Sequence, residues 1–192
     1  MAQSPVVAGR MNRPTPPLLF GTVVFLASEL LFFGGLFAAY FALRAETTPW
    51  PPFGVDLHTT LPAIATGLLV ASSFTFHAAI AAGDRRDLGA FRLWIVVTFV
   101  LGAGFLAAQL WDYSHLNFQV SSSAYGTLFY AMTGFHGLHV AAGLVLMLVV
   151  LGRLAQGAYS DGDVDGARAI SYYWHMVDGV WVGLFLTLYV LR

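Results

Sequence analysis

The chain has 192 residues, of which 58% are hydrophobic and only 10% are charged. Soluble domains carry about 25% charged residues, so most of the surface of this protein must face lipid rather than water. The net charge of −1 argues against nucleic acid as a partner, because nucleic-acid binding calls for a basic patch. Cysteine is absent, which excludes disulfides, thiolate chemistry and cysteine-ligated iron–sulfur clusters.

The first segment, residues 1–17, is polar and rich in proline, and it contains Arg10 and Arg13. The apolar run behind it contains Glu29 and is too long for the core of a signal peptide, which has about 7–15 residues. We therefore expect a polar cytoplasmic tail over residues 1–17, followed directly by a first membrane span.

Five segments are long enough to cross a membrane, which takes about 20 mainly apolar residues. They are residues 18–42, 61–82, 91–113, 124–151 and 170–191. Polar or Pro- and Gly-rich breaks separate them, as is typical of connections between helices. The sequence therefore predicts an all-α, polytopic membrane bundle in which residues 18–192 form one five-helix domain. Small residues inside the spans, Gly102 and Gly143 among them, let helix backbones approach closely.

The arginines predict the orientation, because cytoplasmic loops of membrane proteins carry an excess of Lys and Arg. All nine basic residues are Arg, and Arg44 and Arg192 fall on one side of the predicted bundle. The other side holds the remaining seven, which are Arg10, Arg13, Arg85, Arg86, Arg92, Arg153 and Arg168. We therefore expect the N-terminus in the cytoplasm and the C-terminus outside.

Ionisable residues inside the predicted spans are few, and such residues usually face the interior of a bundle because lipid solvates them poorly. The buried polar candidates are Glu29, His77, His136, His139, His175 and Asp178. At a rise of 1.5 Å per residue, Glu29 and His139 lie near the midplane at depths that agree to within about 2 Å. His77 and His175 share a shallower level. We therefore expect Glu29 and His139 to form the central polar contact of the bundle.

Four interpretations of this polar set compete. The residues could lock the helices together by hydrogen bonds, relay protons, hold a haem between histidines, or bind a metal through His-x-x-His and His-x-x-Asp. Haem ligation needs two histidines that face each other across a haem-sized gap, and a metal site needs more carboxylates or thiolates than one depth offers. The polar lock is favoured, with a proton-related role second. We expect no catalytic residue, cofactor or metal in this chain.

Three strings of the sequence resemble the cytochrome c oxidase subunit III family. They are residues 25–33 around Ser28-Glu29, residues 125–140 with Gly134-Phe135-His136-Gly137-Leu138-His139, and residues 173–181 with Trp174-His175-Met176-Val177-Asp178. The strings occur in the order of the family and with similar spacing, and the likeness covers nearly the whole chain. Larger members of the family have seven helices, and the strings match the last five. The chain thus resembles a short, five-helix form.

The resemblance implies a core subunit without a redox centre in a haem–copper terminal oxidase of a bacterial plasma membrane. Such a complex moves electrons from cytochrome c to oxygen and pumps protons. Subunit III packs on the catalytic subunit, binds phospholipid and supports proton uptake, and haem and copper are expected in its partners, subunits I and II. Membership of a larger respiratory supercomplex stays open. The resemblance also implies that Glu29 is the carbodiimide-reactive glutamate of the family.

Two alternatives remain. A subunit III of a quinol oxidase, or of a complex linked to nitric oxide reductase, would share the same strings, so the electron donor cannot be read from them. A proton-coupled transporter would suit the buried Glu and His residues. Five spans admit no simple two-fold repeat, however, and no pair of Gly- or Pro-broken helices marks a substrate site.

Overall fold

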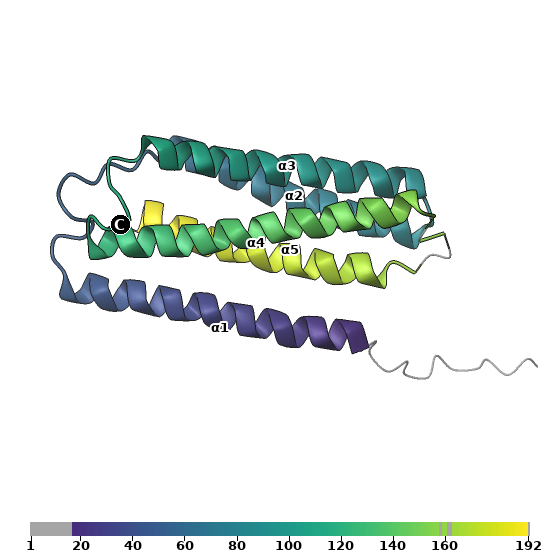
Figure 1. Ribbon diagram of the computed structural model, residues 1–192, viewed down its shortest axis with the longest axis horizontal. Helices are drawn as coiled ribbons and strands as arrows, with labels where there is room; N and C mark the ends of the chain where they lie inside the picture. The colour runs from purple at the N-terminus through teal and green to yellow at the C-terminus, as the bar shows by residue number, and fades with distance from the viewer. Residues whose placement is uncertain (1–16, 158, 161–162, 192) are drawn as a thin grey trace, which may run out of the picture.

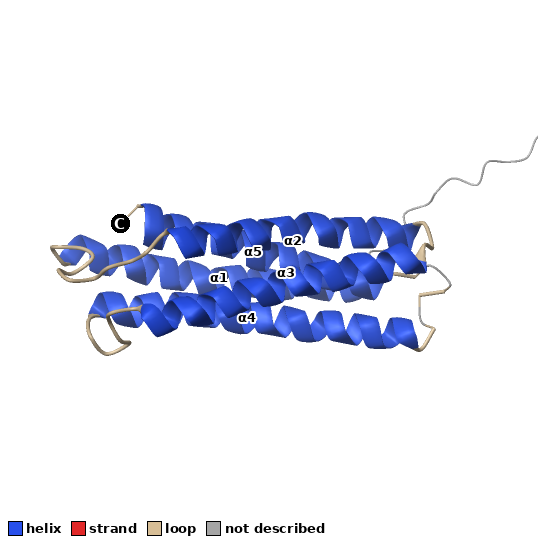
Figure 2. Ribbon diagram, turned by 90° about the horizontal axis from the view of Figure 1, so that it is seen from above, coloured by secondary structure: helices blue, strands red, loops and turns tan. Residues whose placement is uncertain are grey.

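The structure, a computed structural model, describes residues 17–157, 159–160 and 163–191. The α-helices are α1 (Pro17–Glu46), α2 (Thr60–Asp84), α3 (Leu88–His115), α4 (Ala124–Ala155) and α5 (Asp165–Phe185). A π-helical segment, η1 (Leu186–Val190), continues α5. No strand occurs among these residues (Figure 2), and the predicted all-α fold with five helices is confirmed. Of the predicted N-terminal tail, residues 1–16 lie outside the described part of the chain.

Four of the helices form a ring. In chain order, α2 packs on α3, α3 on α4 and α4 on α5, and α5 closes the ring by packing on α2. Helix α1 lies outside this ring and contacts α4 and α5 (Figure 1). The start of α1 and the end of η1 lie at opposite ends of the bundle (Figure 1), as expected for five antiparallel passages.

Helices α1 to α4 are each long and apolar enough to cross a membrane. Helix α5 is not among these candidates, because Arg168, His175 and Asp178 lower its mean hydropathy. It nevertheless runs alongside the other helices over the length of the bundle (Figure 1). The fifth membrane span therefore stays a prediction.

The observed helices extend a few residues past most of the predicted spans, because polar caps lie outside the apolar runs. The predicted span 91–113 lies within α3, whose start is capped by Asp87: its side chain accepts a hydrogen bond of 2.9 Å from the Ala90 amide. Ser123 caps α4 in the same way, accepting from the Gly126 amide at 3.1 Å. Both are residue types that satisfy the free amides at a helix start.

Trp174 of α5 fills the centre of the ring. Its side chain is fully buried, and its indole Nε1 donates to Ser72 Oγ on α2 at 2.8 Å. A Cβ atom on either Gly102 of α3 or Gly143 of α4 would lie 2.6 Å from an atom of the indole. These two glycines therefore make room for a large side chain, which is a more specific role than the close backbone approach expected from the sequence.

Helix α1 buries much less of its surface than the ring helices do. Only Phe33 and Tyr40 of this helix are buried, and large apolar side chains such as Phe20 and Leu31 are exposed. Because α1 contacts the ring along one edge, most of its circumference faces outward. This geometry makes the contacts along that edge important for keeping α1 in place.

Candidate functional site

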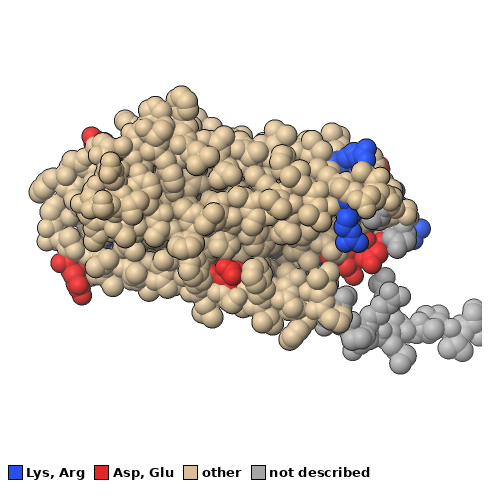
Figure 3. Space-filling model, in the orientation of Figure 1, with Lys and Arg blue, Asp and Glu red and all other residues tan. Residues whose placement is uncertain are grey.

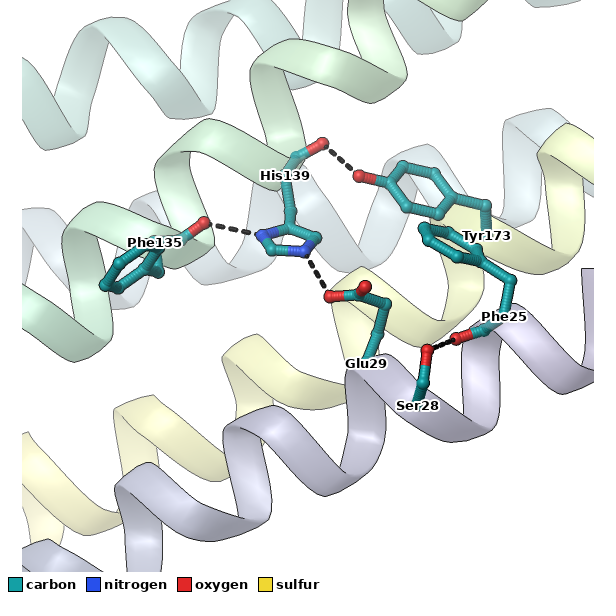
Figure 4. Close-up of polar contacts among 6 residues, drawn as sticks. All are labelled: Phe25, Ser28, Glu29, Phe135, His139 and Tyr173. Carbon is teal, nitrogen blue, oxygen red and sulfur yellow. Dashed lines mark hydrogen bonds and ion pairs between the residues drawn. The ribbon is translucent and has the colours of Figure 1, made fainter.

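The central polar contact joins α1 to α4. Glu29 Oε2 lies 2.8 Å from His139 Nε2, and the exposed fractions of the two side chains are 21% and 18%. Figure 4 shows the carboxyl group and the imidazole pointing toward one another from facing helices. The contact predicted from the depths of these two residues is confirmed.

The surroundings of His139 define which ring nitrogen carries a proton. His139 Nδ1 lies 2.7 Å from the Phe135 carbonyl oxygen, which can only accept, so Nδ1 is protonated and donates. A neutral ring then presents the lone pair of Nε2 to Glu29, and the carboxylic acid donates to it. In the ionised form, the imidazolium donates to the carboxylate instead. Either way, one proton is shared between Glu29 and His139.

Aromatic side chains enclose this contact. Phe33 meets the imidazole edge to face at 5.1 Å between ring centroids, and Tyr173 stacks on it at 6.3 Å. The Tyr173 hydroxyl donates to the His139 carbonyl at 2.9 Å, and the Phe25 ring stacks on the Tyr173 ring at 6.3 Å between centroids. These walls limit the access of other polar groups to the shared proton.

A second polar group, the α2–α5 cluster, consists of Ser73, Ser171, His175 and Asp178. Ser73 Oγ donates its only proton to Asp178 Oδ2, so it accepts from His175 Nδ1, which lies 2.9 Å away. In a neutral ring, His175 Nε2 then accepts from Ser171 Oγ at 3.1 Å. Ser73 was missed in the sequence because it is one of several hydroxyl residues in α2, and nothing in the sequence sets it apart from the others.

Of the two remaining candidates, His136 lies apart from both contacts, and His77 lies beside the α2–α5 cluster without a hydrogen bond to it. His77 was expected to be buried, and this expectation is wrong, because its side chain is exposed in the chain without partner subunits. The imidazole still lies close enough to His175 for an electrostatic interaction. The buried stripe of α2 follows Leu69, Ser72 and Phe76, which turns His77 outward. His136 is fully buried, but neither ring nitrogen has a hydrogen-bond partner among the described residues.

A third polar group was not foreseen. Gln109 Nε2 donates to the Thr133 carbonyl at 2.7 Å and to Tyr113 Oη at 3.1 Å, joining α3 to α4. Nearby, Tyr189 Oη donates to Asp112 Oδ2 at 3.3 Å. Gln109 lies within the predicted span 91–113, but an amide carries no charge, so the ionisable residues of the sequence do not point to it.

The histidines do not converge on a common ligand position. His139 faces Glu29, whereas the ring of His136 packs against Phe105 and Trp181 at centroid distances of 5.6 and 4.9 Å. Within the described ranges, no three His, Cys, Asp or Glu residues form a group that could hold a metal ion. No hydrogen bond between described residues links the Glu29–His139 contact to the α2–α5 cluster. Apart from His77 and His136, the candidate residues pair with polar groups of other helices, which is the geometry of a lock.

Known proteins resemble this chain over nearly its whole length. The sequence model of the family described as Cytochrome c oxidase subunit III matches residues 9–192. A protein of Nocardia farcinica named "Probable cytochrome c oxidase subunit 3" is 44% identical over 186 residues, which are 95% of this chain and 91% of the relative. A protein named cytochrome c oxidase subunit 3 from Corynebacterium diphtheriae is 39% identical, and the match covers 98% of this chain and 95% of the relative. The protein of the same name from Thermostichus vulcanus is 41% identical, and the match covers 90% of this chain and 87% of the relative. These relatives therefore share the short form.

Proposed function

Because the chain belongs to the cytochrome c oxidase subunit III family, we propose that it packs on the catalytic subunit of its oxidase as a scaffold of membrane helices. As a member of this family it is a non-redox subunit of a terminal oxidase, so the haem and copper belong to partner subunits I and II. The observation that best supports a scaffold is the Glu29–His139 contact, in which two ionisable groups satisfy each other across helices.

Purification of the tagged chain in mild detergent tests this assignment. We expect haem absorbance, copper and the two larger oxidase subunits to co-purify with it. The chain separated from its partners should show no Soret band and no stoichiometric copper. A tagged chain that purified without a haem protein would contradict the scaffold role, and a Soret band in the separated chain would contradict its non-redox character.

We propose cytochrome c as the electron donor of the complex, since the relatives carry the name cytochrome c oxidase. Oxygen consumption by the purified complex with reduced cytochrome c and with a reduced quinol separates this donor from the quinol alternative. Rapid oxygen consumption with quinol alone would contradict the proposal. Co-purification of further respiratory proteins would extend the set of partners to a supercomplex.

The orientation proposal is that the start of α1 faces the cytoplasm of a bacterium and that α5 is the fifth span of its plasma membrane. Among the described arginines, only Arg44 belongs to the other end of the bundle. The cytoplasmic end then holds Arg85, Arg86, Arg92, Arg153 and Arg168. Figure 3 shows blue Arg atoms gathered at the end where the α2–α3 and α4–α5 connections lie. This asymmetry is the expected mark of the cytoplasmic side.

Single cysteines report the orientation without background, because the chain has no cysteine. Ser122 lies in the α3–α4 connection and Ser160 in the α4–α5 connection, and both are exposed. In intact cells, an impermeant thiol reagent should label Ser122→Cys and spare Ser160→Cys. The reverse pattern would contradict the orientation.

Phospholipid binding is proposed for a groove of about 660 Å³ between α1 and the helices α4 and α5. Apolar side chains such as Leu18, Phe25 and Val149 line it, and Arg153 lies at its end, where α4 reaches the arginine-rich side. An acyl chain fits apolar walls, and a guanidinium binds phosphate by parallel hydrogen bonds. The Arg153 guanidinium also lies 5.5 Å from the Tyr159 ring, whose pKa is raised by burial, so the phenol stays neutral.

Quantification of lipid phosphorus in the purified complex tests the groove. We expect Arg153→Gln to lower the number of anionic phospholipids retained per complex. Arg92→Gln is the matched control, because Arg92 is exposed on α3 at the same end and does not line the groove. Equal lipid content in the two variants would contradict the proposed head-group contact.

A further inference from the structure

The outward sides of α3 and α4 have the composition of a lipid-facing surface. Leu93 and Val100 on α3 and Leu138 and Leu148 on α4 are large, apolar and more than half exposed. Acyl chains can cover such a surface without leaving a polar group unsatisfied. No protein partner is needed to explain it.

The seam between α2 and α5 differs from that surface. We define the α2–α5 face by Val70 and His77 on α2 and by His175, Gly179 and Val182 on α5. His77, Gly179 and Val182 are exposed, Val70 is 37% exposed, and His175 is half-buried. The face therefore combines an imidazole, a residue without a side chain and moderate apolar groups.

His77 lies at hydrocarbon depth. It precedes the end of α2 at Asp84 by seven residues, which is about 10 Å along the helix. The hydrocarbon core is about 30 Å thick and α2 has 25 residues, so only about one turn at each end lies outside it. None of the hydrogen bonds among the described residues involves the His77 side chain. Lipid chains offer no hydrogen-bond partner to an exposed imidazole, so an unsatisfied polar group at this depth is destabilising.

A groove beside the α2–α5 face is suited to packing against another helix. It has a volume of about 440 Å³ and lies between α1 and α5, with Gly34, Gly179 and Gly183 in its lining. A Cβ on Gly34 or Gly179 would meet no atom within 4 Å. Helices pack by placing ridges of side chains into grooves, and glycines let a second backbone come close.

We propose that a transmembrane helix of another oxidase subunit covers the α2–α5 face and places a hydrogen-bonding side chain opposite His77. Its ridge lies along the groove beside Gly179, and its polar side chain satisfies the imidazole that lipid cannot satisfy. This inference rests on the proposed function, since the helix comes from the complex that the chain joins. Beyond that function, the inference assigns the α2–α5 face to a protein partner and the outward sides of α3 and α4 to lipid.

Photo-cross-linking in the intact, purified complex tests this inference. Val70→Cys and Val100→Cys each receive a thiol-linked benzophenone, on the α2–α5 face and on the outward side of α3. The two valines lie at similar depths, about 20 Å from the arginine-rich ends of their helices. We expect the Val70→Cys probe to cross-link to a partner subunit and the Val100→Cys probe to label lipid only.

The other outcomes contradict the inference. Two results would overturn the docking face and leave the proposed function intact. The first is cross-linking to protein from Val100→Cys, either alone or together with Val70→Cys. The second is cross-linking of Val70→Cys to lipid alone in a complex that still contains its haem. A chain that purifies without any partner would overturn both.

Loss of the imidazole gives a second readout. His77→Leu should lower the fraction of complexes that retain this subunit after detergent washing, and His77→Gln, which can still form hydrogen bonds, should restore most of it. Val100→Leu serves as the matched substitution on the other side and should leave retention unchanged. Equal retention in His77→Leu and the unaltered complex would contradict a hydrogen bond to the partner.

Discussion

The ring helices α2, α3 and α4 and the outlying α1 are all apolar enough to cross a membrane, but the ring and α1 are held in different ways. In the ring, the indole of Trp174 fills space left by glycines on two other helices, and Trp181 Nε1 donates to Thr66 Oγ1 at 2.9 Å. Helix α1 is joined to the ring near its middle by the Glu29–His139 contact. Nearer its C-terminal end, a long hydrogen bond of 3.4 Å runs from Tyr40 Oη to the Thr187 carbonyl.

The difference shows why hydropathy says little about helix association in a membrane. Lipid is as apolar as leucine, so burying apolar side chains between helices gives little driving force, and packing and hydrogen bonds decide. The ring has many such contacts in its interior, whereas α1 has few. Substitutions inside the ring should therefore disturb the whole chain, and substitutions at the edge of α1 should act on this helix.

The largest effect is expected for Gly143→Ala. The new methyl group would lie 2.6 and 2.7 Å from two atoms of the Trp174 ring, which is enclosed and cannot move freely. Overpacking of this kind costs about 1–3 kcal/mol. We expect a lower melting temperature in detergent and a lower yield of complex.

Gly152→Ala is the control for this prediction. Gly152 lies on the same helix, and a Cβ there would meet no atom within 4 Å. Equal melting temperatures for Gly143→Ala and Gly152→Ala would show that the indole does not need this space.

An intermediate effect is expected for loss of the polar contact of α1. Glu29→Ala leaves the imidazole without its partner, and His139→Ala leaves the carboxyl group without its partner. Because the two side chains are 21% and 18% exposed, each variant should lose about 1–1.5 kcal/mol, the low end of the range for an unsatisfied buried group. Because the residues act as a pair, the double variant should be less destabilised than the sum of the single variants. The measurement is a double-mutant cycle on the unfolding free energy in detergent, and strict additivity would contradict the coupling.

The sequence predicted the parts of the molecule that depend on position along the chain. Helix number follows from apolar length, and the Glu29–His139 contact follows from rise per residue. The outward turn of His77 could not be predicted in this way, because depth says nothing about the direction of a side chain around the helix axis. Nor could the role of Gly143, since it depends on a tryptophan 31 positions later that meets it only in the folded bundle.

The smallest effect is expected for Tyr40→Phe. Its hydrogen bond to the Thr187 carbonyl is 3.4 Å long, near the limit for such a contact, and the ring keeps its packing against Trp50 at 5.3 Å. We expect a loss of stability below about 1 kcal/mol, measured as a small decrease in melting temperature. A loss as large as that of Glu29→Ala would mean that α1 is attached mainly at this end.

We infer that Glu29 and His139 hold α1 in place rather than conduct protons, and proton pumping by the Glu29→Gln complex separates these two roles. Glutamine keeps the shape of glutamate, and its amide can donate to His139 Nε2, but it cannot release a proton. We expect Glu29→Gln to assemble and pump nearly as well as the unaltered complex, measured as protons released per electron in vesicles, while Glu29→Ala assembles poorly. Normal assembly of Glu29→Gln together with loss of pumping as severe as in Glu29→Ala would contradict it.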